Sequence, residues 1–110
     1  MKNNFFIDYF KEVENADCID TDYGFILYRI CNRECYICHA YITPSFRGRG
    51  YGKQLLARVM EIAAKNECLE VSCNIFKKDN GAELNRQKYL SQGFEIINEN
   101  KHVITMSREL

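Results

Sequence analysis

The chain has 110 residues, of which 46% are apolar, and it carries 15 acidic and 15 basic residues. That length allows one small domain around one hydrophobic core, so we expect a single domain over residues 1–110. The formal net charge of zero argues against a general nucleic-acid-binding protein, which would show a basic surplus.

The first half of the chain predicts one helix followed by an antiparallel meander. Residues 4–15 place large apolar side chains on one helical face. Three strands should follow, over residues 18–20, 23–31 and 35–43, because these segments are rich in β-branched and aromatic residues. The polar residues 32–34 make the turn between the second and third strands.

Three of the six cysteines lie in this meander, and their spacing has two interpretations. Cys31, Cys35 and Cys38 are spaced like the cysteines that bind the iron–sulfur cluster of radical S-adenosylmethionine enzymes. Those enzymes need a large barrel, which 110 residues cannot build. Cys35 and Cys38 should also point to opposite faces of one strand. We therefore expect reduced, mostly buried thiols and no metal site.

The second half predicts two helices with strands between and after them. Residues 50–66 carry a broad apolar stripe and form the strongest helix of the sequence. A strand over residues 69–76 and a polar loop over 77–81 lead to a helix over 80–92. Strands over residues 94–97 and 102–107 then form a hairpin. The order is α, three strands, α, strand, α, two strands, which indicates a mixed α/β fold.

A segment rich in glycine and arginine joins the third strand to the second helix. It reads Arg47-Gly48-Arg49-Gly50-Tyr51-Gly52. Glycine lets the backbone approach a ligand closely, and the first N–H groups of a helix have no partner within it. The helix dipole adds partial positive charge at the same place. The segment therefore predicts a phosphate site, although a plain turn with solvated arginines has a similar composition.

The spacing of the glycines distinguishes three kinds of phosphate loop. A P-loop would need Ser or Thr after Lys53, where the chain has Gln54, and the dinucleotide fingerprint needs a different glycine spacing. The pattern Arg/Gln-x-x-Gly-x-Gly/Ala fits. It is the coenzyme A pyrophosphate loop of the GNAT N-acetyltransferase superfamily, which the chain resembles here. The segment from Tyr89 to Gly93-Phe94 resembles the Tyr-x-x-x-Gly-Phe segment of the same family, where the glycine ends a helix.

The resemblance implies an acetyl-CoA-dependent N-acetyltransferase with a GNAT-like fold, in which two central parallel strands splay apart around the coenzyme. It implies a short member, in which one helix replaces the usual first strand and helices. The implied coenzyme-binding residues are Tyr41, Ile42, Thr43, Arg47, Gly48, Arg49, Gly50, Tyr51, Gly52, Lys53 and Asn80. The family usually has Asn seven residues before the tyrosine, where this chain has Ala82, so Asn80 would serve only after a small shift.

Tyr89 stands where the family places the acid that protonates the leaving thiolate. Tyrosine is protonated at neutral pH and can give up its proton late in a reaction. A packed aromatic side chain is the structural alternative for this residue. The resemblance thus assigns the catalytic role to Tyr89 and coenzyme A to the glycine loop.

The general base stays open, because the usual glutamate of the strand before the loop is missing. Counting back from Ile42 by twos places Tyr36 and Cys38 at the usual positions, and neither is a carboxylate. Glu34 has the same parity but lies in the turn. His39 should face the other side of the strand. A water relay, or an amine that arrives unprotonated, would remove the need for a base.

The partners implied are acetyl-CoA and an amine acceptor, either a small molecule or a protein lysine or N-terminus. A second copy of the chain could cover the exposed acceptor side. We expect no nucleic acid and no membrane, since no apolar run could span a bilayer and no charged-then-apolar leader opens the chain. A cytoplasmic location follows as an expectation. The alternative function is a catalytically weak module that binds acyl-CoA or a partner protein.

Overall fold

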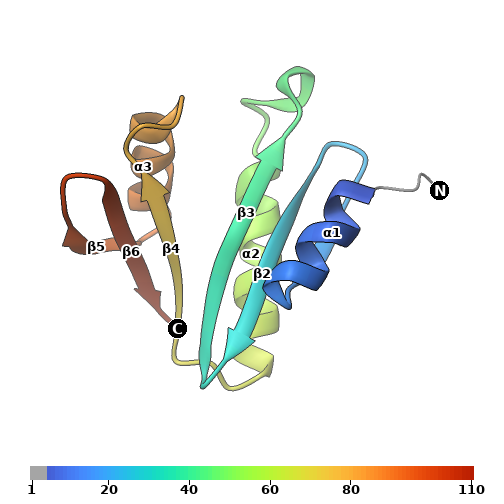
Figure 1. The fold of residues 1–110 in the computed structure, drawn as a ribbon, viewed down its shortest axis with the longest axis horizontal. Coiled ribbons are helices and arrows are strands. Elements are labelled where there is room, and N and C mark those ends of the chain that lie inside the picture. Colours follow the sequence, from blue (N-terminus) through green and yellow to red (C-terminus); the bar gives the residue numbers. More distant parts are fainter. Residues whose placement is uncertain (1–4) are drawn as a thin grey trace.

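The computed structural model describes residues 5–110 as a six-stranded mixed sheet with helices on both faces (Figure 1). The elements are α1 (Phe5–Glu14), β1 (Asp17–Asp20), β2 (Gly24–Cys31), β3 (Glu34–Ile42), the 3-10 turn η1 (Pro44–Phe46), α2 (Tyr51–Lys65), β4 (Glu70–Phe76), α3 (Ala82–Ser91), β5 (Glu95–Glu99) and β6 (Val103–Glu109). This order confirms the predicted α/β arrangement. Asn4, where the first helix is predicted to start, lies outside the described residues.

The predicted antiparallel meander is confirmed, and its second turn is tighter than predicted. Strands β1, β2 and β3 pair antiparallel in that order. Asn32 and Arg33 alone form the turn, with φ values of 51° and 63°, and Glu34 already belongs to β3. Positive φ at both central residues matches the twist of the flanking strands in a two-residue hairpin.

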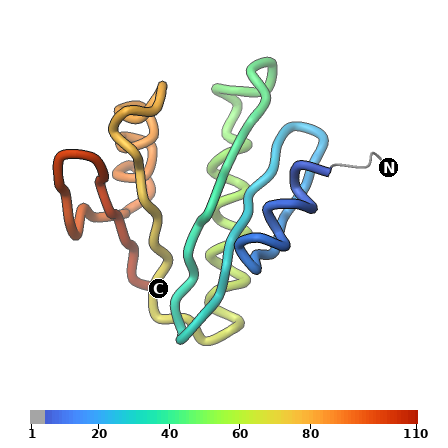
Figure 2. The backbone as a smooth tube through the Cα atoms, viewed as in Figure 1, coloured from blue at the N-terminus to red at the C-terminus, as the bar shows by residue number. Residues whose placement is uncertain are grey.

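Strands β3 and β4 are parallel neighbours only over their first halves. The sheet order is β1-β2-β3-β4-β6-β5. The pairing between β3 and β4 runs from Glu34 opposite Glu70 to Ile37 opposite Cys73. Beyond those residues the two strands diverge, as the tube in Figure 2 shows between the cyan-green and yellow segments. The sheet therefore opens at the carboxyl ends of its two central strands.

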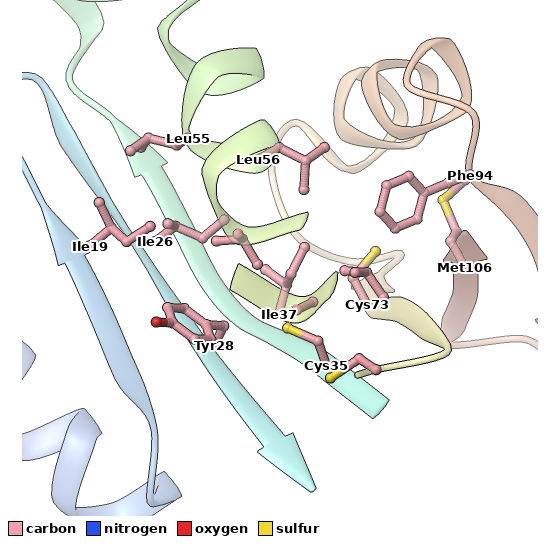
Figure 3. Close-up of a cluster of buried hydrophobic side chains, with 14 of the residues drawn as sticks. Ile19, Ile26, Tyr28, Cys35, Ile37, Leu55, Leu56, Cys73, Phe94 and Met106 are labelled. Atoms are coloured by element: carbon pink, nitrogen blue, oxygen red, sulfur yellow. The ribbon is translucent and has the colours of Figure 1, made fainter. Parts of the chain in front are cut away.

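The helices divide unequally between the two faces of the sheet. Figure 1 shows α1 in front of β2, with α2 and α3 behind the sheet. The main core lies between α2, α3 and the sheet, where Ile26, Leu55 and Met106 are almost fully buried (Figure 3). On α1, by contrast, Ile7 is the buried residue. Within residues 5–110, no helix is long and apolar enough to cross a membrane.

A β-bulge interrupts the alternation of side chains along β3. Tyr28 pairs with Ile37 and Leu27 pairs with His39, so Cys38 is an extra residue on this strand. An extra residue shifts the later side chains to the opposite face. A count by twos from the end of β3 therefore fails when it crosses Cys38.

The bulge corrects the predicted orientation of His39. Its imidazole Nε2 lies 3.3 Å from a carboxylate oxygen of Glu14, and its ring lies 4.6 Å from that of Phe10, both on α1. Tyr36 faces the same side, because the Arg29 guanidinium that lies over its ring also bonds the Glu14 carbonyl. The prediction that His39 faces away from Tyr36 was wrong, since the sequence does not reveal the extra residue.

Candidate functional site

The glycine loop begins where β3 ends and adopts conformations that require glycine. Pro44 starts a 3-10 turn, and Gly48 and Gly50 follow with φ values of 75° and 84°. Residues with a side chain rarely adopt this left-handed region. Gly50 is also the residue that caps the start of α2. The loop therefore reaches the helix without any bulky side chain at its two tightest points.

Backbone N–H groups at the start of α2 are available to an anion. The N–H of Gln54 bonds the Gly50 carbonyl at 3.1 Å. The N–H groups of Tyr51, Gly52 and Lys53 come before it. In an α-helix these first N–H groups have no carbonyl partner within the helix. A Cβ added to Gly48 or Gly50 would meet no atom within 4 Å, so the space above the loop is open. These features, with the helix dipole, are those that favour an anion at a helix start.

Two exposed arginines border this loop. Arg47 donates from Nε to the backbone carbonyl of Ile42 at 2.9 Å, and its guanidinium lies 5.5 Å from the Tyr41 ring. The Arg49 guanidinium lies 5.8 Å from the Phe46 ring. Both charges therefore stay beside the loop, where they can contact a bound phosphate.

An aromatic cluster holds the base of the loop, and the sequence analysis missed it. The rings of Tyr23 and Tyr51 stack with centroids 4.1 Å apart, and the Phe46 ring meets Tyr51 edge-on at 5.7 Å. Tyr51, predicted as a coenzyme contact through its backbone, is thus fixed through its side chain as well. The aromatic residues at 23, 46 and 51 were visible in the sequence, but nothing there indicated that they meet.

The backbone of the last β3 residues alternates between the sheet and its open edge. Thr43 donates its N–H to the Tyr23 carbonyl at 2.9 Å, so that group is used within the sheet. Neighbouring residues of a strand direct their backbone groups to opposite edges. Of the three predicted residues, Ile42 therefore directs its N–H and carbonyl towards the diverging β4. Tyr41, like Thr43, directs its backbone groups towards β2.

Tyr89 lies near the end of α3, where the local sequence fixes the chain reversal. The helix ends at Ser91, Gly93 takes a φ of 87°, and the N–H of Phe94 bonds the Tyr89 carbonyl at 3.1 Å. The buried Phe94 ring meets the Tyr89 ring edge-on at 5.1 Å. The spacing from Tyr89 to Gly93 and Phe94 thus describes a helix terminus that also packs the tyrosine.

The environment of Tyr89 keeps its phenol protonated. Burial raises the pKa of Tyr89, and the neighbouring Cys73 and Tyr36 groups raise it further. Cys73 is the last β4 residue that pairs with β3, and Tyr36 lies one residue before the end of the same pairing. The phenol of Tyr89 therefore lies within electrostatic range of the point where the two strands separate.

Asn80 lies in the exposed loop before α3 and outside the helix. The predicted start of this helix is too early, because Gly81 takes a φ of 80° and caps a helix that begins at Ala82. Ala82 packs against the core, while the N–H of Asn85 bonds the Gly81 carbonyl. The start of α3 thus repeats the left-handed glycine cap of α2.

Polar side chains connect β3, β4 and β6 on the α1 side of the sheet, which was not apparent from the sequence. Asn74 donates from Nδ2 to the Tyr36 hydroxyl at 3.1 Å, and Thr105 donates to Asn74 Oδ1 at 2.7 Å. Nearer the start of β3, Ser72 donates to a Glu34 carboxylate oxygen at 2.7 Å. Burial raises the pKa of Tyr36, and the Asn74 bond partly opposes that rise.

Cys35 and Cys38 point to opposite faces of the sheet, as predicted. Cys35 is fully buried in the main core, whereas Cys38 lies beside Glu14 and Arg29 on the opposite face. Cys31 is exposed at the end of β2. Among residues 5–110, no three His, Cys, Asp or Glu side chains gather as a metal site requires.

Comparison with known proteins gives one family match and many structural matches. The model of the family described as "Acetyltransferase (GNAT) family" matches residues 16–94. A search of curated protein sequences gave no match. The solved PaiA N-acetyltransferase of Thermoplasma acidophilum, in complex with coenzyme A, is 17% identical with a TM-score of 0.74, and the match covers 100% of this chain and 81% of that one.

Two further structures have the same fold. The IAA acetyltransferase of Bacillus cereus is 17% identical with a TM-score of 0.74, covering 98% of this chain and 85% of that chain. The anti-CRISPR protein AcrVA5 is 22% identical with a TM-score of 0.69, covering 82% of this chain and 96% of that chain. At these identities the structural matches show a shared fold.

Proposed function

Because the chain belongs to the GNAT acetyltransferase family, we propose that it transfers the acetyl group of acetyl-CoA to a primary amine. The observation that carries this proposal is the placement of two features around the diverging strands. The open glycine loop follows the end of β3, and Tyr89 lies within electrostatic range of the last β3–β4 pair. A phosphate site and a protonated acid at the same opening suit an acyl-CoA thioester.

The coenzyme would bind along the opening in two parts. Its pyrophosphate would accept from the N–H groups at residues 48–53 and from Arg47 and Arg49. The amides of its pantetheine arm would pair with the edge of β3 that faces the diverging β4, where Ile42 directs its backbone groups and its carbonyl also accepts from Arg47. Asn80, in the loop before α3, would contact the coenzyme from the other side. The open space above Gly48 and Gly50 supports this placement.

Transfer would proceed by direct attack. The amine nitrogen forms a bond to the thioester carbon, and the electron pair of the C=O bond moves to oxygen. When the C–S bond breaks, the sulfur takes the proton of the Tyr89 hydroxyl, and Tyr89 recovers a proton from solvent. A phenol is protonated near neutral pH, so Tyr89 carries a proton to give when the thiolate forms.

The nitrogen would lose its proton to water and not to a protein carboxylate. On β3 the side chains at the opening are Tyr36, Cys38 and His39. Burial raises the pKa of Tyr36 and Cys38, so both stay protonated near neutral pH and are poor bases. The imidazole of His39 already contacts the Glu14 carboxylate at 3.3 Å. We propose that the acceptor amine attacks as the free base.

The acceptor side of the sheet carries an apolar surface on α1. Phe5, Phe6, Tyr9 and Val13 are each at least 60% exposed. An aromatic surface of this kind supports a macromolecular neighbour, either a protein acceptor or a second copy of the chain. The mass of the protein in solution distinguishes these two partners.

Six free cysteines suit a cytoplasmic enzyme.

A second candidate function is an acyl-CoA-binding module with weak catalysis. It is favoured by the side chains at the opening, because the β3 residues that face α1 there are Tyr36 and His39 and not a carboxylate. Such a module would bind the coenzyme through the same loop. It would differ from the enzyme in turnover alone.

The experiment that tests the proposal measures binding and transfer separately. Calorimetry with coenzyme A should give saturable binding to one site. Release of free thiol from acetyl-CoA should then depend on added amine, tested with polyamines, amino acids, peptides and a lysine-rich protein. Binding with no amine-dependent release would favour the second candidate. Absence of coenzyme binding would refute both.

A further inference from the structure

Tyr36 projects from β3 towards the point where the two central strands part. Its Cα partner across the parallel pair is Ser72, yet its hydroxyl bonds Asn74, two residues farther along β4. Asn74 lies just beyond Cys73, the last β4 residue paired with β3. The Tyr36 ring therefore leans along the strands, and its hydroxyl lies at the start of the opening.

The hydrogen bonds around Tyr36 determine where its proton can go. Thr105 donates to Asn74 Oδ1 at 2.7 Å, which leaves Asn74 Nδ2 to donate to the Tyr36 oxygen at 3.1 Å. An amide N–H group is a donor and cannot accept a hydrogen bond from the phenol. The Tyr36 oxygen accepts from Asn74, so its O–H group is left to donate to a group other than this amide.

The rest of the surroundings keep Tyr36 a neutral donor. The Arg29 guanidinium lies over the face of its ring, 5.1 Å from the centroid, and only partly opposes the upward effect of burial on the pKa of Tyr36. The side chain is half-buried, and burial disfavours the phenolate. Tyr89 approaches the same opening from the face covered by α2 and α3, since its neighbour Cys73 belongs to the core on that face. One phenol thus lies on each side of the opening.

We propose that Tyr36 is a catalytic hydrogen-bond donor that binds the thioester carbonyl oxygen as it becomes anionic, with Asn74 and Thr105 as its positioning residues. The inference rests on the proposed acetyl transfer. As the amine nitrogen bonds to the carbonyl carbon, the C=O electron pair moves to the oxygen, and Tyr36 donates a hydrogen bond while keeping its proton. When the C=O bond re-forms, the C–S bond breaks and Tyr89 gives its proton to the sulfur.

Two variants remove this donor in different ways. Tyr36→Phe deletes the hydroxyl. Asn74→Asp keeps the shape of the side chain but replaces the amide donor with a carboxylate. The carboxylate would accept a hydrogen bond from the Tyr36 hydroxyl and so turn this donor away from the substrate. A matched control is Ser72→Ala, because it breaks the Ser72–Glu34 bond on the same face but farther from the opening.

Kinetics give the first readout. Loss of one preorganised donor to an oxyanion lowers kcat by about 100-fold, and we expect this for both Tyr36→Phe and Asn74→Asp. The KM of both variants for acetyl-CoA should stay near that of the wild type. Ser72→Ala should keep both the kcat and the KM of the wild type. Thr105→Val frees the Asn74 amide to turn, so its kcat should lie between that of the wild type and that of Tyr36→Phe. An active Tyr36→Phe enzyme would overturn the inference.

The infrared spectrum of bound acetyl-CoA gives a second readout that needs no turnover. With a 13C-labelled thioester carbonyl, the hydrogen bond from Tyr36 should lower the C=O stretching frequency in the wild type and in Ser72→Ala. Tyr36→Phe and Asn74→Asp should return it towards the value in solution. A frequency that is the same in all four proteins would overturn the role of Tyr36 while leaving the proposed function intact. A wild type that does not bind acetyl-CoA would overturn both.

Discussion

The Nε atom of Arg47 donates a hydrogen bond to the backbone carbonyl of Ile42 at a distance of 2.9 Å. This bond joins the glycine loop to the last residue of β3, so one arginine contacts both places where the coenzyme is proposed to bind. The guanidinium keeps further N–H groups that can face a phosphate. Arg47 is therefore the arginine that most directly connects the strand end with the loop.

Replacement of either loop arginine should weaken coenzyme A binding. Charge-assisted bonds from partly exposed groups contribute about 1.4 kcal/mol, so Arg47→Ala and Arg49→Ala should each raise the Kd by about tenfold. Calorimetric titration with coenzyme A measures this directly. Arg58→Ala is the matched control, because Arg58 is exposed about two turns into α2. Equal affinity of all three variants and the wild type would contradict the pyrophosphate assignment.

Tyr89→Phe should lower kcat and leave coenzyme binding unchanged. The substitution removes the proposed proton donor but keeps the ring that packs edge-on against Phe94. We expect a loss of about 100- to 1000-fold in kcat, within the range for general acid catalysis, and a Tm within a few degrees of the wild type. Leu90→Ala, at an exposed position one residue later on α3, should retain activity. A fully active Tyr89→Phe would show that another group protonates the thiolate.

The raised pKa of Tyr89 also predicts the shape of the pH profile. The acid form is present below the pKa, and burial moves that pKa upward from its ordinary value of 10.0. The activity should therefore not fall through loss of the acid as the pH rises from 7 to about 9, while the fraction of free amine increases. A kcat that declines below pH 9, in a protein that stays folded, would contradict this assignment.

The sequence predicted those parts of the fold that depend on neighbouring residues. The antiparallel turn after β2, predicted at residues 32–34, and the helix stop at Gly93 each depend on a few adjacent residues. Their conformations follow from glycine and polar turn residues at fixed positions. The order of helices and strands and the glycine loop were accordingly predictable.

The parts of the site that were missed depend on how distant segments align. The extra residue at Cys38 is defined by the register against β2, and no local pattern distinguishes it from a regular strand residue. The bond between Asn74 and Tyr36 joins residues 38 positions apart. Such contacts follow from strand pairing, so the face of His39 and the polar network of Tyr36 required the structure.

Two buried thiols should make the protein less stable in alkali. Burial raises the pKa of Cys35 and Cys73 from 9.0 to about 12. In the folded protein these two thiols therefore keep protons that they lose above pH 9 in the unfolded chain. The contribution of these thiols to the free energy of unfolding should be constant below that pH and then fall by about 1.4 kcal/mol per pH unit for each thiol.

Urea unfolding between pH 7 and 10, with reductant present, measures this alkaline slope. Cys35→Ala and Cys73→Ala should each reduce the slope above pH 9, although each also lowers the overall stability by opening a cavity. Cys31→Ala is the control, since Cys31 is exposed in the folded protein. A slope that no cysteine substitution changes would show that other groups cause the alkaline loss of stability.

Gly50 and Gly52 form a matched pair for the last prediction. Gly50 has a φ of 84° with open space around an added Cβ, whereas Gly52 lies in α2 outside the positive-φ glycines, and its added Cβ would lie 3.7 Å from Ile42. Gly50→Ala should destabilise the protein by about 1–2 kcal/mol through backbone strain alone. Gly52→Ala should stabilise it by about 0.5–1 kcal/mol, because alanine favours the helix. Thermal unfolding without ligand measures both.

The same pair separates stability from binding when coenzyme A is added. Gly50→Ala should lose affinity, because relief of the strain moves the N–H groups that start α2. Gly52→Ala places a methyl group beside those N–H groups, so a loss of affinity in this more stable variant would indicate that the pyrophosphate contacts the loop closely. Coenzyme binding that neither substitution changes would place the phosphates away from the start of α2.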